Sequence, residues 1–371
     1  MHPGLSLYLD LVRLLAAFEV FVFHMGTFPL LAVGRQVWNA YGHEAVTIFF
    51  VLSGFVIRHA VNKPGVTLED FTVNRISRVY SVAIPCLLLT LLFDWLGRPA
   101  LPELYKGLIP SGPPWQLAAL GAAMLNENWG STLMISNIPY WSISYEFWYY
   151  WIFAALFFAT GGARWLFAAL FMLIAGPNIL LMAPIWAMGW WAYRWRPDLP
   201  LRSWLAWLLF LQPLAVFGAY AYFDWIMWTR QLMVPLIGFR EWHVGLGFSR
   251  FFISDMLLGL SVTGHLLGAR TLAPLLLVLL RRIGPVVRVL AGYSFTLYLL
   301  HQPAMLVIGA FIVPDVAPAA RGWVVGAGTL LIVWGVSFVT ETQRDRLKSP
   351  VRAVFRAVER LLRRWPGLRQ T

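Results

Sequence analysis

Two ionisable residues lie on one face of the first long apolar stretch of the chain. Arg13 and His24 are eleven positions apart, so in a helix of about 100° per residue they return to nearly the same face, about 16 Å apart along the axis. Asp10 lies one turn before Arg13 and can pair with it. Ionisable groups within apolar spans are costly and usually face a polar interior. The spacing predicts a cation and an imidazole on one polar path. A packing ion pair and a core histidine remain the alternative.

A carboxylate and a hydroxyl occur in two other apolar stretches. Glu146, in PYWSISYEFWYYW, is predicted at a depth similar to that of His24. A carboxylate beside an imidazole raises its basicity and fixes its tautomer, as a general base requires. We therefore expect His24 to be a base oriented by Glu146 or Asp255, and His301 adds another ionisable group within a span. Ser53, in FFVLSGFVI, is a candidate oxyanion donor or acylated nucleophile. The alternative pairs Glu146 with another cation.

Two arginines lie one turn apart in the segment FTVNRISRVYSVAIP. Guanidinium groups bind phosphates in a bidentate manner. We expect Arg75 and Arg78 to do so, with Arg58 nearby. Basic residues at a membrane boundary also arise from topology alone. The motif by itself favours that topological reading.

The composition identifies the class of protein. Of the 371 residues, 59% are hydrophobic and 12% are charged, whereas soluble domains have roughly 45–50% and about 25%. This excludes disorder, a fibre and an ordinary water-soluble enzyme. The single cysteine, Cys86, excludes an intramolecular disulfide and a zinc site of paired thiolates, and no metal site is expected. The 20 tryptophans are typical of interfacial belts.

Apolar runs bounded by Gly, Pro or charge predict an all-α polytopic membrane bundle of about ten transmembrane helices, some short or broken. The short apolar stretch 115–126 is expected to be a re-entrant or interfacial helix. The expected spans are 6–29, 44–58, 79–96, 140–159, 165–176, 179–195, 203–224, 251–267, 290–312 and 323–340.

The distribution of basic residues predicts the orientation. With both termini in the cytoplasm, the Lys and Arg residues show a roughly threefold bias toward cytoplasmic segments. The net charge of +12 lies in short loops and the tail, so we expect no nucleic-acid partner. The first apolar stretch contains charged residues and is expected to be a retained span, not a signal peptide.

The last residues form a separate basic segment. From Lys348 to Trp365, apolar residues recur at helical spacing with arginines between them. This predicts an amphipathic helix on the anionic inner leaflet, with membrane lipids as its partner, while docking of a protein is the alternative. We therefore expect a transmembrane domain over 1–345 and a cytoplasmic tail over 346–371.

Five segments together resemble the acyltransferase-3 family of integral membrane acyltransferases. The order and spacing of these segments across residues 5–305 carry the resemblance. Ser81 departs from the family, because many members have proline there, and Leu11-Val12 replaces the more usual Gly-Leu. The segments are LDLVRLLAAFEVFVFH, AVTIFFVLSGFVI, FTVNRISRVY, WSISYEFWYY and YSFTLYLLHQP.

The resemblance implies an enzyme of the plasma (inner) membrane that moves an acyl group, usually acetyl, from cytoplasmic acyl-CoA to a hydroxyl of an envelope or exported glycan or another glycosylated acceptor. It implies essential roles for His24 and Arg13, a position near the coenzyme for Arg75 and Arg78, and a supporting role for Glu146. Acetyl-CoA would be a donor substrate, and no permanently bound cofactor is expected.

Two other functions fit the same buried charges. A proton-coupled transporter or flippase of a glycan or lipid-linked intermediate would use them as a substrate or proton path, without needing coenzyme A. A non-catalytic scaffold would leave His24 and Glu146 without a purpose. The sequence leaves open the acceptor, the acyl chain length, the oligomeric state and any protein partner.

Overall fold

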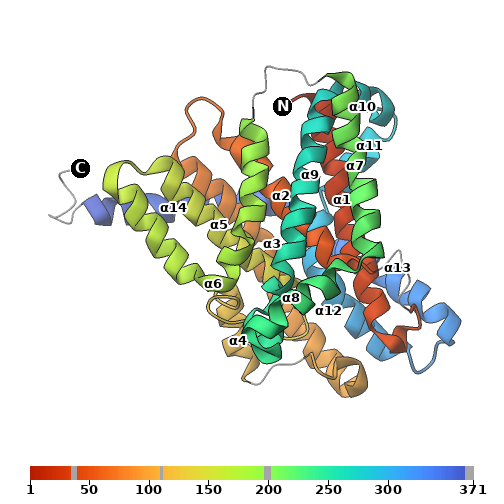
Figure 1. The fold of residues 1–371 in the computed structure, drawn as a ribbon. Coiled ribbons are helices and arrows are strands. Elements are labelled where there is room, and N and C mark those ends of the chain that lie inside the picture. The colour runs from red at the N-terminus through yellow and green to blue at the C-terminus, as the bar shows by residue number, and fades with distance from the viewer. Residues whose placement is uncertain (35–39, 109–111, 196–201, 364–371) are drawn as a thin grey trace.

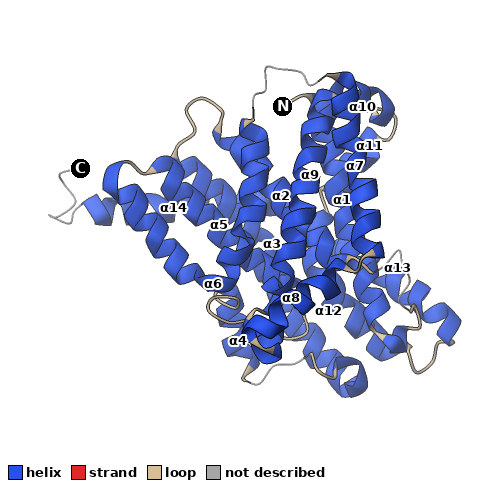
Figure 2. Cartoon of the chain, in the orientation of Figure 1, coloured by secondary structure: helices blue, strands red, loops and turns tan. Residues whose placement is uncertain are grey.

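The protein is a bundle of helices, as the composition predicts. The computed structural model describes residues 1–371 except 35–39, 109–111, 196–201 and 364–371. Within the described ranges no strand forms, and helices of very different length make up the regular structure (Figure 2). The expected all-α membrane bundle is confirmed.

Among the described residues, ten helices have 18 residues or more. They are α1 (Pro3–Thr27), α2 (Gly42–Val61), α3 (Leu68–Ala100), α5 (Trp141–Phe158), α6 (Gly161–Arg194), α7 (Ser203–Tyr222), α9 (Phe252–Thr271), α12 (Ser294–Ile312), α13 (Pro318–Ser337) and α14 (Arg344–Arg363). The shorter helices are α4 (Pro114–Ala122), α8 (Trp225–Ile237), α10 (Ala273–Leu280) and α11 (Gly284–Ala291). Single turns are η1 (Pro29–Leu31), η3 (Pro102–Tyr105), η4 (Ile138–Tyr140), η5 (Glu241–Gly245), η6 (Gly247–Phe251) and η7 (Glu341–Gln343).

Seven helical stretches of the described chain are long and apolar enough to cross a membrane; they contain α2, α3, α6, α7, α9, α12 and α13. The helix α1 falls outside this set because it carries Asp10, Arg13 and Glu19. The helix α5 is rich in Trp and Tyr. Both are packed inside the bundle, since α1 contacts α2 and α12, and α5 contacts α6.

The helix α6 joins two segments that the sequence predicts as separate spans. Gly176 interrupts it with φ 80° and ψ 174°, and Pro177, which has no backbone N–H, follows. A Cβ at Gly176 would lie 2.7 Å from the backbone N of Trp129. The chain therefore kinks where glycine is required both by the positive φ and by the close approach of a loop.

Glycines allow α2 and α6 to cross in direct backbone contact. A Cβ on Gly54 would lie 2.0 Å from the carbonyl oxygen of Trp186, and one on Gly189 would lie 1.8 Å from that of Val51. Small residues permit such approach in membrane helices. The contact holds Ser53, beside Gly54, against α6.

Different helices lie at the two ends of the bundle. Figure 1 shows the amino terminus with α10 and α11 at one end, and α4 and α8 at the other. The helices α1 and α3 begin at the first of these, here called the amino-terminal end, and run toward the second, the opposite end. Of the predicted stretch 115–126, the residues up to 122 form the short helix α4 at the opposite end. Its interfacial placement stays a prediction.

The basic tail forms the helix α14, which lies against the beginning of α3. Arg352 pairs with Glu69 at 2.9 Å and with Asp70 at 3.4 Å, and Arg356 pairs with Glu69 at 3.0 Å. The apolar side chains at 354, 358 and 361 are exposed. The predicted amphipathic helix is therefore present, while residues 364 and 365 lie outside the described residues and its leaflet contact stays a prediction.

Candidate active site

A cavity with a free volume of about 80 Å³ lies between α1, α2, α3, α5 and α12. It is smaller than the ~150 Å³ cavity that accepts benzene, so it suits a slender group. Most of the predicted site residues line it, although they come from four different helices. They are Arg13, Ser53, Arg75, Arg78 and Glu146.

Glu146 is the acceptor of two hydroxyl groups on the cavity wall. Ser53 Oγ donates to Glu146 Oε1 at 2.5 Å, and Tyr150 donates to the same oxygen from one turn further along α5. Trp186 Nε1 donates to Ser53 Oγ at 3.1 Å. The Ser53 proton is thus directed at a carboxylate, an arrangement that suits a hydroxyl donor or an activated nucleophile.

The two arginines of α3 project into the cavity at its amino-terminal side. The Arg75 guanidinium lies 5.7 Å from the centre of the Tyr150 ring. Arg78 lies in the electrostatic field of Asp10, Glu146 and Glu341, and within the described chain it makes no direct ion pair. Its N–H groups are therefore available to an anionic ligand.

Arg13 is held by bonds within α1 and to α11. Its Nη2 donates to Asp10 Oδ1 at 3.0 Å and to the carbonyl oxygen of Ala291, at the end of α11, at 3.3 Å. The Asp10–Arg13 pair suggested by the sequence is present. The Nε of Arg13 is buried without a partner among the described residues, which leaves one donor for a group in the cavity.

Arg58 does not join the other arginines. Its guanidinium lies over the rings of Phe157, at 5.1 Å, and Trp190, at 5.8 Å, and it is absent from the cavity lining. Cation–π contacts with α5 and α6 hold it in place. The structure therefore separates Arg58 from Arg75 and Arg78.

His24 contacts His301 and makes no contact with Glu146. His24 Nδ1 lies 2.8 Å from the carbonyl oxygen of Val20 and 3.1 Å from His301 Nε2. His301 Nδ1 lies 2.8 Å from the carbonyl oxygen of Leu297. A carbonyl only accepts, so His301 is protonated on Nδ1, its Nε2 accepts, and His24 is also protonated on Nδ1. The lone pair of His24 then lies on Nε2, as a base requires.

The prediction that Glu146 or Asp255 orients His24 is therefore wrong, because His301 contacts His24 instead. Glu146 is engaged by Ser53 and Tyr150, and α12 supplies the side chain that reaches His24. Similar depth in two helices does not make them neighbours, and α1 packs against α2 and α12. The imidazole nevertheless lies inside the bundle beside another ionisable group.

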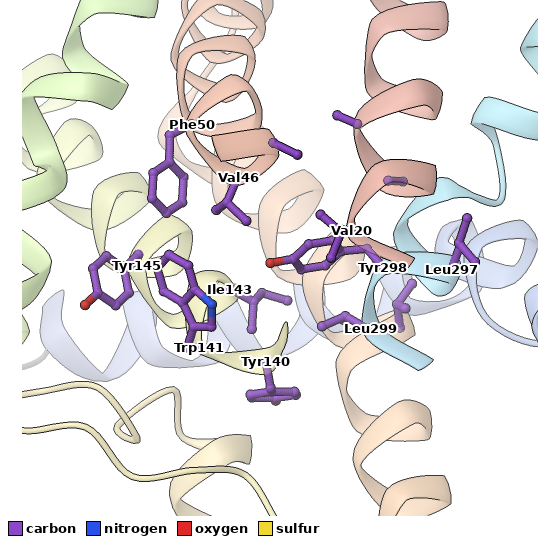
Figure 3. Close-up of a cluster of buried hydrophobic side chains, with 14 of the residues drawn as sticks. Val20, Val46, Phe50, Tyr140, Trp141, Ile143, Tyr145, Leu297, Tyr298 and Leu299 are labelled. Atoms are coloured by element: carbon purple, nitrogen blue, oxygen red, sulfur yellow. The ribbon is translucent and has the colours of Figure 1, made fainter. Parts of the chain in front are cut away.

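Tyr298 is the residue of the cavity lining that lies closest in sequence to His301. Its hydroxyl lies 2.6 Å from Ser142 Oγ, and both residues line the cavity. Figure 3 shows its side chain reaching from α12 toward Ile143 of α5. His301 follows one turn later on α12, a rise of about 5 Å. The cavity lining described here ends at Tyr298 and does not include His24.

Asp255 pairs with a histidine that sequence reasoning did not single out. His43 Nε2 lies 2.9 Å from Asp255 Oδ2, and Thr47 Oγ1 donates to Oδ1 at 3.2 Å. The His43 ring stacks on Trp141 with an interplanar angle of 13°. The one signal in the sequence is the i, i+4 spacing of His43 and Thr47, which puts both on one face of α2.

Comparison with known proteins adds one finding. Residues 6–338 match the sequence model of a family described as an acyltransferase domain. The matched range contains the cavity, the His24–His301 and His43–Asp255 pairs, most of α1 and all helices from α2 to α13, and it ends before α14. No curated protein and no solved structure matches the chain.

Proposed function

The chain belongs to the acyltransferase-3 family of integral membrane acyltransferases, and from this premise we propose that it transfers an acetyl group from acetyl-CoA to a hydroxyl of a glycan or another glycosylated acceptor. The observation that supports the proposal best is the convergence of Arg13, Arg75 and Arg78 on one narrow cavity, whose lining includes Tyr298, one turn before the paired His301 on α12. Such a cavity suits a long anionic donor with a slender reactive end.

The donor would enter from the amino-terminal end, which we assign to the cytoplasm of a plasma-membrane protein with both termini inside. Arg75 and Arg78 would bind the phosphates of the coenzyme, since guanidinium groups bind phosphate in a bidentate manner. The acyl-pantetheine arm would extend past Arg13 toward Tyr298, where the free volume is small.

The transfer itself would need a base and an oxyanion donor. His24 Nε2 would take the proton of the acceptor hydroxyl as its oxygen forms a bond to the thioester carbonyl carbon. Arg13 or Ser53 would stabilise the resulting oxyanion. Breaking the carbon–sulfur bond would release the coenzyme thiolate, which takes the proton from His24. His301 would act as a positioning residue that holds the His24 tautomer together with the carbonyl oxygen of Val20.

A variant of this route would form an acyl-enzyme on Ser53. The short contact from Ser53 Oγ to Glu146 Oε1 puts a proton acceptor beside the hydroxyl. Direct transfer and the covalent route differ in one product, because only the second leaves label on the protein.

The function is tested with membranes that contain the full chain and acetyl-CoA labelled in the acetyl group. We expect release of free coenzyme thiol and movement of label to endogenous glycans. Membranes with the H24A variant should show neither thiol release nor label transfer. H243A changes an imidazole that lies outside the cavity and outside the His24–His301 and His43–Asp255 pairs, so its membranes should keep both activities. Glycan movement across the membrane without thioester consumption would instead establish a transporter and overturn the proposal.

A further inference from the structure

A groove of about 910 Å³ lies at the end of α3 that is remote from Arg75 and Arg78. The last turns of α3, the turn η3 and the start of α4 form its walls. It lies within the size range of sites for small organic ligands, ~300–1,000 Å³. Its polar and aromatic lining consists of Asp94, Trp95, Arg98, Glu103, Tyr105 and Lys106, and we call it the α3–η3 groove.

The Tyr105 hydroxyl has no hydrogen-bond partner among the described residues. Tyr105 is 3% exposed, and its hydroxyl is buried without a hydrogen bond to any described residue. A Cβ at Gly97 would lie 2.0 Å from this oxygen, so glycine leaves the room that it occupies. An unsatisfied buried hydroxyl destabilises a folded protein. Tyr105 lines the groove, and a polar ligand that moves its side chain away from Gly97 would supply the missing bond.

The remaining lining indicates the chemistry of that ligand. Arg98 and Lys106 are balanced by Asp94 and Glu103, so the groove does not favour a strongly charged molecule. Asp94 already accepts from the Ser136 backbone N at 3.1 Å and from Ser136 Oγ at 2.5 Å.

An apolar surface completes the lining. The side chain of Trp95 is 73% exposed and offers a broad ring surface. A neutral ligand ring fits this lining, because its apolar face can stack on Trp95 and its hydroxyl groups can bond to the polar side chains of the groove.

A hydrogen-bonded side chain links the helix that forms the groove, α3, with the helix that carries His301, α12. Asn137 Nδ2 donates to Thr90 Oγ1 at 3.1 Å and to the carbonyl oxygen of Leu299 at 2.8 Å. Thr90 is one turn before Asp94 on α3, and Leu299 is two residues before His301 on α12. A molecule bound in the groove is therefore on the side of the histidine pair that faces away from the arginine cavity.

We propose that the α3–η3 groove binds the acceptor, a neutral carbohydrate whose ring stacks on Trp95 and whose hydroxyl bonds to Tyr105. The inference rests on the proposed function for the reaction and adds the place and chemical class of the second substrate. Donor and acceptor would thus approach the histidine pair from opposite ends of the bundle.

The first test measures acceptor-dependent release of coenzyme thiol from acetyl-CoA by the purified full chain. The acceptors are the methyl glycosides of a hexose, a 6-deoxyhexose and an N-acetylhexosamine. Y105F removes only the unpartnered hydroxyl and should raise the half-saturating glycoside concentration about three- to tenfold. W95A should raise it on the order of tenfold or more. Neither should change the KM for acetyl-CoA.

The matched control is W115A, because Trp115 is 71% exposed at the same end of the bundle but does not line the groove. Equal effects of W95A and W115A, or unchanged glycoside kinetics in both groove variants, would overturn the groove assignment while leaving the reaction intact. If no glycoside stimulates thiol release in the wild-type protein, the acceptor class is wrong and the second test decides whether the groove binds carbohydrate at all.

The second test needs no turnover. K106C places a thiol on a side chain that is 81% exposed at the groove, while native Cys86 is fully buried and gives little background. A bound glycoside should slow labelling of K106C by a membrane-impermeant maleimide at least threefold, without slowing labelling of R240C, another exposed position. Equal labelling rates with and without every glycoside would overturn the proposal.

Discussion

His301 Nε2 lies 3.1 Å from His24 Nδ1, and this contact joins α12 to α1 in the interior of the bundle. Because His301 Nδ1 lies 2.8 Å from the carbonyl oxygen of Leu297, His301 Nε2 accepts, and together with the carbonyl oxygen of Val20 it holds the proton of His24 on Nδ1. An imidazole can thus hold another imidazole in its basic tautomer where a carboxylate more often has that role.

Loss of either imidazole should affect catalysis differently. H24A should lower acetyl transfer by more than about a hundredfold, since a positioned base contributes ~10²–10⁴-fold. H301A should lower kcat less, about tenfold, and shift the pH profile of kcat, because His24 keeps its base function and its bond to the carbonyl oxygen of Val20 but loses the bond to His301. The measurement is the rate of coenzyme thiol release from pH 5 to 9.

The control for both variants is H243A, which should match the wild-type protein across the pH range. An H301A profile that is scaled down without any shift would indicate a structural role alone for His301. Full activity of H24A would remove the proposed base.

The arginines should separate into a donor-binding pair and a structural residue. R75A and R78A should each raise the KM for acetyl-CoA at least tenfold, because a hydrogen bond to a charged group contributes about 1.5–3 kcal/mol. R58A should raise it less than twofold, since Arg58 lies over Phe157 and Trp190. Competition by 3′-phosphoadenosine, which carries no thioester, provides a second measure of donor binding. A rise in R58A as large as that in R75A would place Arg58 at the phosphates.

Ser53 distinguishes the two chemical routes. Under direct transfer, S53A removes one donor and should lower kcat about ten- to a hundredfold. Under the acyl-enzyme route it should abolish transfer, and wild-type protein quenched in acid after brief exposure to labelled acetyl-CoA should carry label that S53A lacks. The control is S142A, which changes another hydroxyl of the cavity lining. Residual S53A activity together with unlabelled wild-type protein would exclude the covalent route.

Periodicity and residue type were enough to predict which side chains face the interior. The eleven-residue spacing of Arg13 and His24, the pair Arg75 and Arg78, and Ser53 beside a glycine all rest on rules that act within one helix. The structure brings four of these five residues to one cavity. Rules that act within one helix succeed here because a charged side chain that faces lipid is so costly that it must lie on the face of its helix that points into the bundle.

Contacts between helices could not be predicted in the same way. The expected partner of His24 was Glu146 or Asp255, but the helix that lies beside α1 brings His301, and Asp255 pairs with His43. The sequence gives the depth of a residue along its own helix, but its contact partner on another helix depends on how all the helices pack together. The kink of α6 also depends on a distant contact, between Gly176 and the loop residue Trp129.

The crossing of α2 and α6 should not tolerate a side chain. G189A would place a Cβ 1.8 Å from the carbonyl oxygen of Val51, so the helices would have to separate and Ser53 would shift from Glu146. We expect lost activity and a large fall in the yield of monodisperse protein in detergent. G335A, at a glycine with open space around its Cβ position, should express and act normally. Wild-type yield and activity of G189A would contradict the close crossing.

A buried carboxyl in the loop between α4 and η4 should make stability depend on pH. Glu127 is 0% exposed, its Oε1 accepts from Ser131 Oγ at 3.3 Å and Asn126 Nδ2 at 3.3 Å, and burial raises the pKa of Glu127 to about 8. Between its ordinary pKa of about 4.5 and 8, the folded protein holds a proton that the unfolded chain has lost. The contribution of Glu127 to stability is therefore full below about pH 4.5 and falls as pH rises to about 8.

The thermal unfolding midpoint in detergent should accordingly fall by several degrees more for the wild-type protein than for E127Q between pH 5 and pH 8. The amide of E127Q keeps the size of the side chain and does not titrate, so it removes only this slope. E103Q is the control, because Glu103 is 73% exposed and its replacement should leave the wild-type slope. If E127Q and the wild-type protein lose stability in parallel across this interval, Glu127 is ionised in the folded protein and another group must set the dependence.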